Sequence, residues 1–265
     1  MLFSDVKRVI FKKNPLVQVI CQLRFPRILL INEKPPSGFQ ERIRAKYPIF
    51  NSGVEQLHQF VMGQGMDVSP KFVQNEQSAI YSFSSDDGVW QINLTSTYLA
   101  LITTEYKRWE DFLSRLQEPL SALMEEYSPA FFERVGLRYV DAYSRSKLSI
   151  DSQMPWVDLF KPFILGFLSN NEIADEVKGY TATTELNIGK GAEVRVVTST
   201  GFIGDEAFKQ DPEVSFIVDS DFSFNMRKTQ EELNDSLEYL HENASRLINN
   251  IITDNLYSAM EPEEI

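Results

Sequence analysis

Cysteine and histidine are almost absent from this sequence of 265 residues. One cysteine, Cys21, excludes an internal disulfide and favours a reducing compartment. Cys21 lies in an apolar run, which favours a buried structural thiol over a nucleophile. The two histidines, His58 and His241, lie on predicted helices, and neither has another histidine or cysteine at ligand spacing. The sequence therefore predicts no zinc site, and we expect both histidines at the surface or at its rim.

Long apolar runs and the common phosphate-binding and nucleophile motifs are absent too. No stretch approaches the roughly 18 unbroken apolar residues that a membrane helix needs. Residues 1–15 mix basic and apolar side chains and contain no small-residue cleavage site, which argues against a signal peptide. Gly-x-Ser-x-Gly, P-loop and dinucleotide-binding glycine patterns are missing. We expect a cytoplasmic protein without membrane contact, cofactor or complete catalytic set.

Apolar residues are abundant, and charge is unevenly distributed. Hydrophobic residues make up 43% of the chain and include 19 phenylalanines, enough for a large core. The net charge is −12, yet residues 1–48 hold ten Lys and Arg against three Asp and Glu. One interpretation is that this basic segment contacts nucleic acid through residues such as Arg42, Arg44 and Lys46. The other is that it packs beside the acidic remainder of the same or a partner subunit.

The hydrophobic periodicity alternates between strand and helix patterns. Residues 16–25 place Val19, Cys21 and Leu23 on one side and Gln22 and Arg24 on the other, as in a strand with one dry face. Further strands are predicted at 71–84, 89–96, 97–105, 135–143, 180–189, 192–203 and 213–225. Helices are predicted at 38–47, 54–62, 107–127, from 129 onward, at 155–169 and at 230–259. Pro119 predicts a kink or break, Thr229 and Glu232 a capping box, and residues 261–265 a frayed tail.

The order of these elements repeats. A β–α–β–β–β–α series in residues 1–128 is followed by a second in residues 129–265. The first strands share the similar tripeptides Leu23-Arg24-Phe25 and Leu137-Arg138-Tyr139, which are 114 positions apart (137 − 23). We therefore predict an α+β fold made of a duplicated β-α-β-β-β-α unit. Its mainly antiparallel sheets would have helices packed on one face, within one compact pseudo-symmetric unit.

Three stretches resemble a known family. Residues 14–26 (NPLVQVICQLRFP), the run from Trp90-Gln91 to Trp109-Glu110, and residues 134–139 (RVGLRY) are similar to motifs of a sporadically distributed prokaryotic family of uncharacterised proteins of about this length. The family pattern has Glu where this chain has Gln18, and Asn where it has Asp141. The resemblance implies a patchily distributed gene of the kind found in defence or toxin–antitoxin loci. It implies no activity, cofactor or catalytic residue.

Polar side chains on the strands supply the candidate site. Arg24 and Arg138 occupy equivalent positions in the repeat, and with Gln22 they form a predicted binding site for phosphate or carboxylate. The alternative is that each arginine pairs internally, with Asp141, Glu185 or Asp219. Asp219 and Asp221 share one face of a predicted strand and are the fallback metal site, with Glu185, Glu193 and Arg195 on neighbouring strands. The alternative for these carboxylates is a solvated outer face.

These observations favour a binding role over a catalytic one. We predict a non-enzymatic binding or regulatory protein that acts through protein–protein contacts, as a homodimer or with another partner, in a defence or toxin–antitoxin type locus. One alternative is a nucleic-acid-associated protein that binds through the basic N-terminal segment. A second is a metal-dependent phosphodiesterase built on Asp219 and Asp221.

Overall fold

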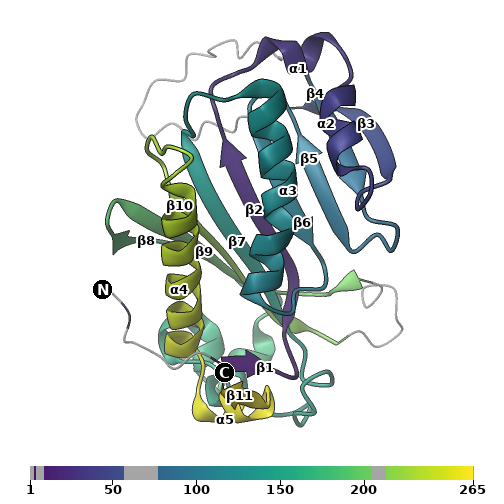
Figure 1. The fold of residues 1–265 in the computed structure, drawn as a ribbon. Coiled ribbons are helices and arrows are strands. Elements are labelled where there is room, and N and C mark those ends of the chain that lie inside the picture. Colours follow the sequence, from purple (N-terminus) through teal and green to yellow (C-terminus); the bar gives the residue numbers. More distant parts are fainter. Residues whose placement is uncertain (1–2, 4–8, 57–76, 205–212, 265) are drawn as a thin grey trace, which may run out of the picture.

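A broad antiparallel sheet of nine strands dominates the computed structural model, which describes residue 3 and residues 9–56, 77–204 and 213–264 (Figure 1). The strand order is β3-β4-β5-β6-β2-β7-β10-β9-β8. The strands are β2 (Leu16–Arg24), β3 (Ile49–Gln56), β4 (Gln77–Ser84), β5 (Trp90–Leu94), β6 (Tyr98–Thr103), β7 (Arg134–Tyr143), β8 (Thr181–Gly189), β9 (Ala192–Gly201) and β10 (Ser215–Phe224). The mixed α/β architecture with an antiparallel sheet is as the sequence predicted.

Strands β2 and β7 lie at the centre of the sheet and join the two sequence halves. Their register sets Cys21 opposite Leu137 and Leu23 opposite Val135, all fully buried. Because strand side chains alternate between faces, these residues make one face of the sheet dry. The two halves therefore share one sheet and one core, while their origin by duplication stays a prediction.

Two long helices, α3 (Trp109–Tyr127) and α4 (Leu233–Ile251), cover that dry face. They run side by side across the sheet, with β2 and β7 visible between them (Figure 1). The shorter helices are α1 (Leu29–Glu33), α2 (Ser37–Ile43) and α5 (Asp254–Ala259). Helix α3 buries Phe112, Leu116 and Leu123, which recur at helical spacing. No helix in the described ranges combines the length and apolar character needed to cross a membrane.

Several predicted helix boundaries are wrong. Helix α3 continues through Pro119, so the break that was one of the two predicted outcomes there does not occur. The helix ends at Tyr127, and its C-cap residue, Ser128, adopts a left-handed conformation with φ 44°. No helix begins at 129. Instead, Phe132 forms a β-bridge with Lys228 on the way into β7. The helix predicted at 54–62 is contradicted where β3 reaches Gln56, and the rest lies outside the described residues.

Residues 155–169 form a series of 3₁₀ turns where the sequence predicted one helix. The turns are Trp156–Asp158, Pro162–Ile164 and Gly166–Ser169, and a fourth follows at Ala174–Glu176. Prolines at 155 and 162 and a glycine at 166 disfavour a continuous helix. The apolar residues of the segment still pack inward, because Trp156 and Phe160 contact Phe216 on β10.

The C-terminal helix prediction fails at Ile252. That residue bridges to Phe160, and Thr253 then caps α5 by accepting a hydrogen bond from the Leu256 amide at 3.4 Å. One hydrogen bond of the predicted capping box is present among the described contacts. The Thr229 amide donates to the Glu232 side chain at 2.8 Å, just before α4 begins.

Residues 261–264 of the predicted frayed tail are ordered. Strand β11 (Pro262–Glu264) pairs with β1 (Val9–Phe11), and Lys12 forms an ion pair of 2.8 Å with Glu263. This short ribbon of both chain ends lies beside α5, at the end of the sheet where α4 finishes (Figure 1). Pairing with a distant segment supplies hydrogen bonds that the local sequence did not reveal.

The thiol of Cys21 is a structural core group, as the sequence predicted. It is fully buried in the centre of the sheet, and burial raises its pKa to about 12. Because the thiolate is the reactive form, iodoacetamide should label the native protein on the order of a thousandfold more slowly than the protein unfolded in guanidinium chloride. Mass spectrometry of timed samples measures both rates. Fast labelling of the folded chain would contradict this burial.

Candidate functional site

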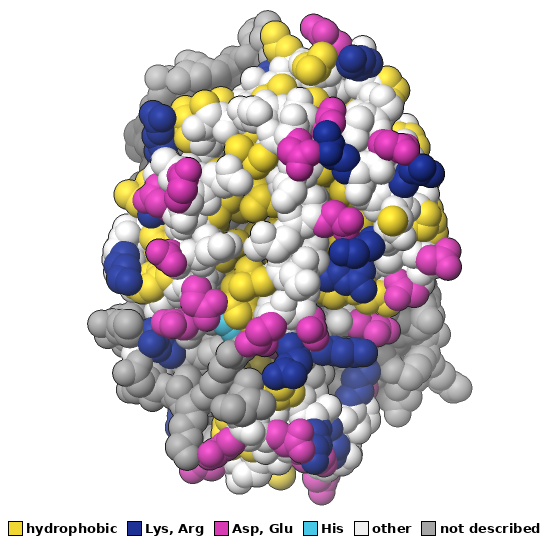
Figure 2. Space-filling view, viewed as in Figure 1, with side chains coloured by type: hydrophobic (Ala, Val, Ile, Leu, Met, Phe, Trp, Pro, Cys, Tyr) yellow, Lys and Arg dark blue, Asp and Glu magenta, His cyan; other side chains and the backbone are white. Residues whose placement is uncertain are grey.

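A cavity of about 130 Å³ lies on the dry face of the sheet, under α4 and beside the first turn of α3, with β1 and Met260 on its other side. Hydrophobic side chains gather along the furrow between the two helices, and charged side chains surround its lower end (Figure 2). Its apolar and aromatic lining includes Phe11, Leu16, Tyr106, Trp109, Tyr139, Ile248 and Met260. Its polar lining includes Asn14, Asp141, Ser220, His241, Ser245 and Asn249. The exposed charged residues Lys107, Arg108 and Glu110 complete the lining. Such a combination of apolar surface and convergent polar groups is typical of ligand sites.

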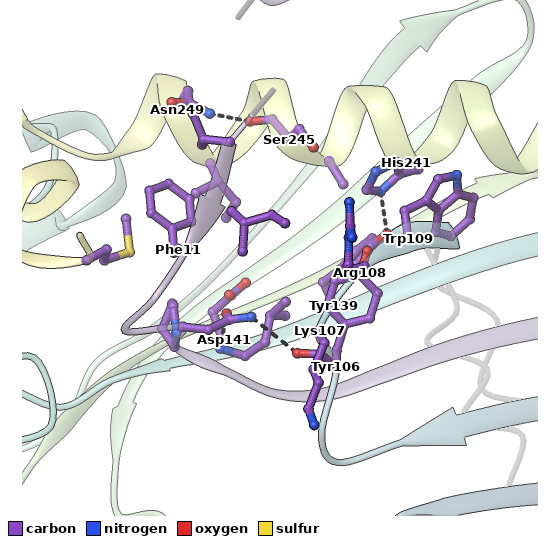
Figure 3. A pocket seen from close by; sticks show the side chains of 18 of the residues that line it. Phe11, Tyr106, Lys107, Arg108, Trp109, Tyr139, Asp141, His241, Ser245 and Asn249 are labelled. Atoms are coloured by element: carbon purple, nitrogen blue, oxygen red, sulfur yellow. Dashed lines mark hydrogen bonds between the residues drawn. The ribbon is translucent and has the colours of Figure 1, made fainter. Parts of the chain in front are cut away.

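The strand and helix periodicities explain why these residues meet. On β7, Tyr139 and Asp141 are two residues apart and share the face that carries the buried Leu137. On α4, His241 and Ser245 are four residues apart, so both face the sheet on the same side of the helix. Figure 3 shows α4 along one wall, with Tyr139 and Asp141 on the floor below it. The cavity thus combines residues that are far apart in sequence.

Asp141 is the unusual group of the cavity. Its side chain points into the space between Phe11 and Tyr106 (Figure 3), and the residue is only 4% exposed. Its Oδ2 atom has no hydrogen-bond partner within the described part of the chain. Burial, with a contribution from the negative charge of Asp219, raises the pKa of Asp141 to about 7. A buried carboxyl group with a strongly shifted pKa marks a candidate binding or catalytic position.

Tyr139 and His241 form a rigid polar pair beside Asp141. The distance from Tyr139 Oη to His241 Nδ1 is 2.9 Å (Figure 3). The imidazole also stacks on the Trp109 ring with centroids 4.3 Å apart, and Trp109 Nε1 donates to Glu238 at 2.5 Å. Burial keeps the pKa of Tyr139 well above its usual value, so its hydroxyl retains a proton to donate. These contacts fix the wall that α3 and α4 share.

The site residues predicted from the sequence lie on the opposite, open face of the sheet. Arg138 donates from Nε and Nη2 to the two oxygens of Asp219, at 2.6 and 2.5 Å. Gln22 accepts a bond of 3.2 Å from Arg134, which also binds both oxygens of Asp221 at 2.7 and 2.8 Å. Arg138 therefore pairs with Asp219 inside the chain, which is the alternative that the sequence left open.

The predicted pair of Arg24 and Arg138 is not brought together. Arg24 is exposed and stands opposite Arg134, whereas Arg138 stands opposite Ile20. Four strand residues separate these positions, which is about 13 Å along the sheet. Arg134, which the sequence reading passed over, is instead the residue that links β2 to β10. Its guanidinium crosses Gly136 so closely that a side chain there would collide with it.

The fallback metal site is occupied by guanidinium groups. Asp219 and Asp221 each bind an arginine, and Glu185 lies at 4.0 Å from Arg195 on the neighbouring pair of strands. Among the described residues, no three His, Cys, Asp or Glu side chains gather closely enough to hold a metal ion. A cation would have to displace these arginines first.

The basic N-terminal segment is largely paired within the chain. Arg42 contacts Glu125 and Glu126 on α3, the latter at 2.8 Å, and Lys46 contacts Glu118 at 3.1 Å. Ion pairs also join Lys12 to Glu263, Lys13 to Glu261 and Arg44 to Glu41. This agrees with packing beside the acidic remainder of the same chain. It leaves fewer cations available for a phosphate backbone.

The cavity residues carried a signal that the sequence analysis did not use. Asp141 falls on the dry face of a predicted strand, in phase with Leu137 and Tyr139, where a carboxylate is costly. His241 falls near the apolar stripe of the last helix, and the structure finds it half-buried at the cavity, which fits the rim position expected for it. His58 lies outside the described residues. Nothing local showed that α3 and α4 leave a space over Asp141.

Comparison with known proteins adds no assignment. No protein family model matches the chain, and a search of curated proteins found no match. The resemblance to a sporadically distributed prokaryotic family therefore stays a prediction from the motifs alone.

Proposed function

We propose that this chain is a binding protein whose site is the cavity under α4 and beside the first turn of α3, and that it takes a small, largely apolar molecule there. The observation that carries the proposal is Asp141, a buried carboxyl group whose Oδ2 has no partner in the described chain and faces this cavity. An unpartnered buried polar atom costs about 1–3 kcal/mol of stability. Retaining it in a cavity is reasonable when a ligand supplies the missing partner.

The size of the cavity limits the ligand to one ring with a short substituent. An apolar protein cavity of about 150 Å³ holds one benzene molecule, and this cavity measures about 130 Å³. Arg108 and Glu110 line the cavity and are exposed, so a short extension can reach toward solvent on their side. Phe11, Ile248 and Met260 supply apolar contact for the ring.

We also infer that the two halves arose by duplication, which would explain where the cavity lies. Outward from the β2–β7 pair, each half contributes its last strand, β6 or β10, then its earlier strands in reverse order. Gln22 pairs with Gly136, the residue 114 positions later, as expected for a pseudo-twofold axis through that pair. The helices that close the two halves, α3 and α4, would then flank the axis, and the proposed site lies under α4 beside the first turn of α3.

Filling the cavity should abolish binding. Replacing Ala244, which lines the cavity from α4, by phenylalanine puts a ring where the ligand would lie. Saturation-transfer NMR with 2-phenylethanol, 2-phenylethylamine and phenylacetate should detect at least one of these compounds on the wild type. The signal should fall at least tenfold in Ala244→Phe, because a ring of this size fills such a cavity.

The matched control is Glu242→Phe, an exposed position on the same helix. It should bind as the wild type does, and circular dichroism should show both variants folded. If Ala244→Phe is unfolded, Ser245→Trp at the less buried side of the same cavity replaces it. Absence of binding by all three compounds to the wild type would refute the proposed site, as would undiminished binding by a folded, filled variant.

The earlier predictions rank behind this one. A role in protein–protein contacts, including a homodimer, stays a prediction. The nucleic-acid alternative has less support because Arg42, Arg44 and Lys46 each contact a glutamate. The phosphodiesterase alternative has less support because Asp219 and Asp221 each bind an arginine.

A further inference from the structure

We propose that the ligand of this cavity is an amine, with a protonated nitrogen that pairs with Asp141 and a single apolar ring that fills the rest of the space. The inference rests on the proposed function and adds the chemical class of the ligand. It follows from the geometry of one buried acceptor, from the rings around it and from the position of the other charges.

Asp141 lacks a hydrogen-bond donor for one of its two oxygens among the described residues. Asp141 Oδ2 is buried and lines the cavity, and no described donor reaches it. Two neighbouring polar groups are already engaged, because Tyr139 bonds to His241 and Asn14 donates to the Tyr106 carbonyl at 3.4 Å. A buried carboxylate is stabilised chiefly by a cation that also donates a hydrogen bond. An ammonium group meets both requirements.

Two aromatic rings and a hydroxyl group surround the place where the nitrogen would lie. Tyr106 and Tyr139 meet edge to face with ring centroids 6.1 Å apart, and both line the cavity close to Asp141. Aromatic faces attract cations, and the attraction grows where water is excluded. Ser220, directly opposite Tyr139 on β10, offers a hydroxyl oxygen as a second acceptor. The floor of the cavity therefore suits a positive nitrogen.

The other fully charged side chains of the cavity are exposed, unlike that of Asp141. Lys107, Arg108 and Glu110 also line the cavity, but all three are exposed residues. An anionic ligand would have to place its charge beside Asp141 or keep it near these exposed residues, outside the buried space. A neutral alcohol could donate one bond to Asp141 without the added attraction of charge. The expected order of affinity is amine, then alcohol, then acid.

Calorimetric titration of the three single-ring probes tests this order. At pH 8 we expect 2-phenylethylamine to bind the wild type at least tenfold more tightly than 2-phenylethanol, with phenylacetate weakest. In Asp141→Asn the amine should fall to the level of the alcohol, while the alcohol changes less than about threefold. Asp175→Asn, an exposed aspartate on a 3₁₀ turn, is the matched control and should keep the wild-type order.

A pH series adds a second readout. The affinity of the wild type for the amine should rise between pH 6 and pH 8 as Asp141 loses its proton, since the amine stays protonated throughout. His241, Tyr106 and Tyr139 also face the cavity, so the series is repeated with Asp141→Asn. A rise that persists in this variant would assign the effect to another group, such as His241, and would overturn the proposal.

The outcomes separate the two levels of inference. Equal binding of amine and alcohol by the wild type would overturn the amine assignment but leave the cavity as a ligand site. Amine selectivity that survives in Asp141→Asn would also overturn it. If none of the three probes binds, both the amine assignment and the proposed function fail.

Discussion

Replacing Asp141 by asparagine should remove a large pH dependence from the stability of the protein. The pKa of this carboxyl group is about 7 in the folded chain, against 3.8 as its ordinary value. The folded state therefore holds the proton more tightly than the unfolded state. Unfolding releases the proton between these two values, so stability falls as pH rises through this window and is level outside it.

The expected size of this pH effect on stability follows from the pKa shift of Asp141. Each pKa unit corresponds to about 1.4 kcal/mol, so this group alone should cost the wild type about 4 kcal/mol between pH 4 and pH 7. Asparagine has the same shape and no charge, so its free energy of unfolding should lack this fall. Urea denaturation of both proteins across pH 4 to 8 measures the difference. It should favour the variant progressively up to pH 7.

In the difference between variant and wild type, the contributions of the other carboxylates to the pH dependence of stability cancel. Glu213 and Glu261 have pKa values lowered by their hydrogen bonds with Ser146 and Lys13, so they oppose the trend of Asp141 at acid pH. Both are present in the two proteins. A difference that does not change with pH would show that Asp141 ionises as freely when folded as when unfolded. It would also weaken the case for a buried site.

Truncating Phe216 to alanine should lower the free energy of unfolding by about 3–5 kcal/mol. The Phe216 ring is fully buried on the helix side of β10, with the Phe160 ring 4.5 Å and the Trp156 ring 5.6 Å from its centroid. Tyr180 stacks on it at 6.2 Å. These contacts fasten the 3₁₀ segment to the sheet, so the cavity left by alanine could not readily collapse.

Urea denaturation of Phe216→Ala at neutral pH measures the loss. The matched control is Phe202→Ala, at a ring that is 45% exposed, and it should cost well under half as much. The melting temperature of Phe216→Ala should fall by roughly 10 °C. A loss below about 1 kcal/mol would mean that the segment around Trp156 does not depend on this ring.

Strands were the elements most completely visible in the sequence. The alternation of Val19, Cys21 and Leu23 predicted both β2 and the face that it buries. The strands β7 to β10 also lie where the sequence predicted strands. These strands pack one face and expose the other, so a pattern with a period of two residues follows directly.

The errors occurred where distant contacts decide the local conformation. Trp156 and Phe160 satisfy a helical pattern, but their anchor is Phe216, 56 positions beyond Phe160, and 3₁₀ turns reach it. The tail at Glu263 forms a strand only because β1 lies beside it. Neither partner can be identified from neighbouring residues.

The sequence by itself determined the α+β class, the dry face of the central strands and the burial of Cys21, because these depend on periodicity and on the transfer of apolar groups from water. Only the tertiary structure decided which face holds the candidate site. The sequence left open whether Arg138 binds a ligand or pairs with an acid such as Asp219, and sheet register joins these two residues across neighbouring strands. Asp141 looked like one more strand residue, yet it faces a cavity under α4, where its Oδ2 atom has no partner among the described residues. The reason is that pairing and enclosure depend on which segments meet, and those segments are far apart in the chain.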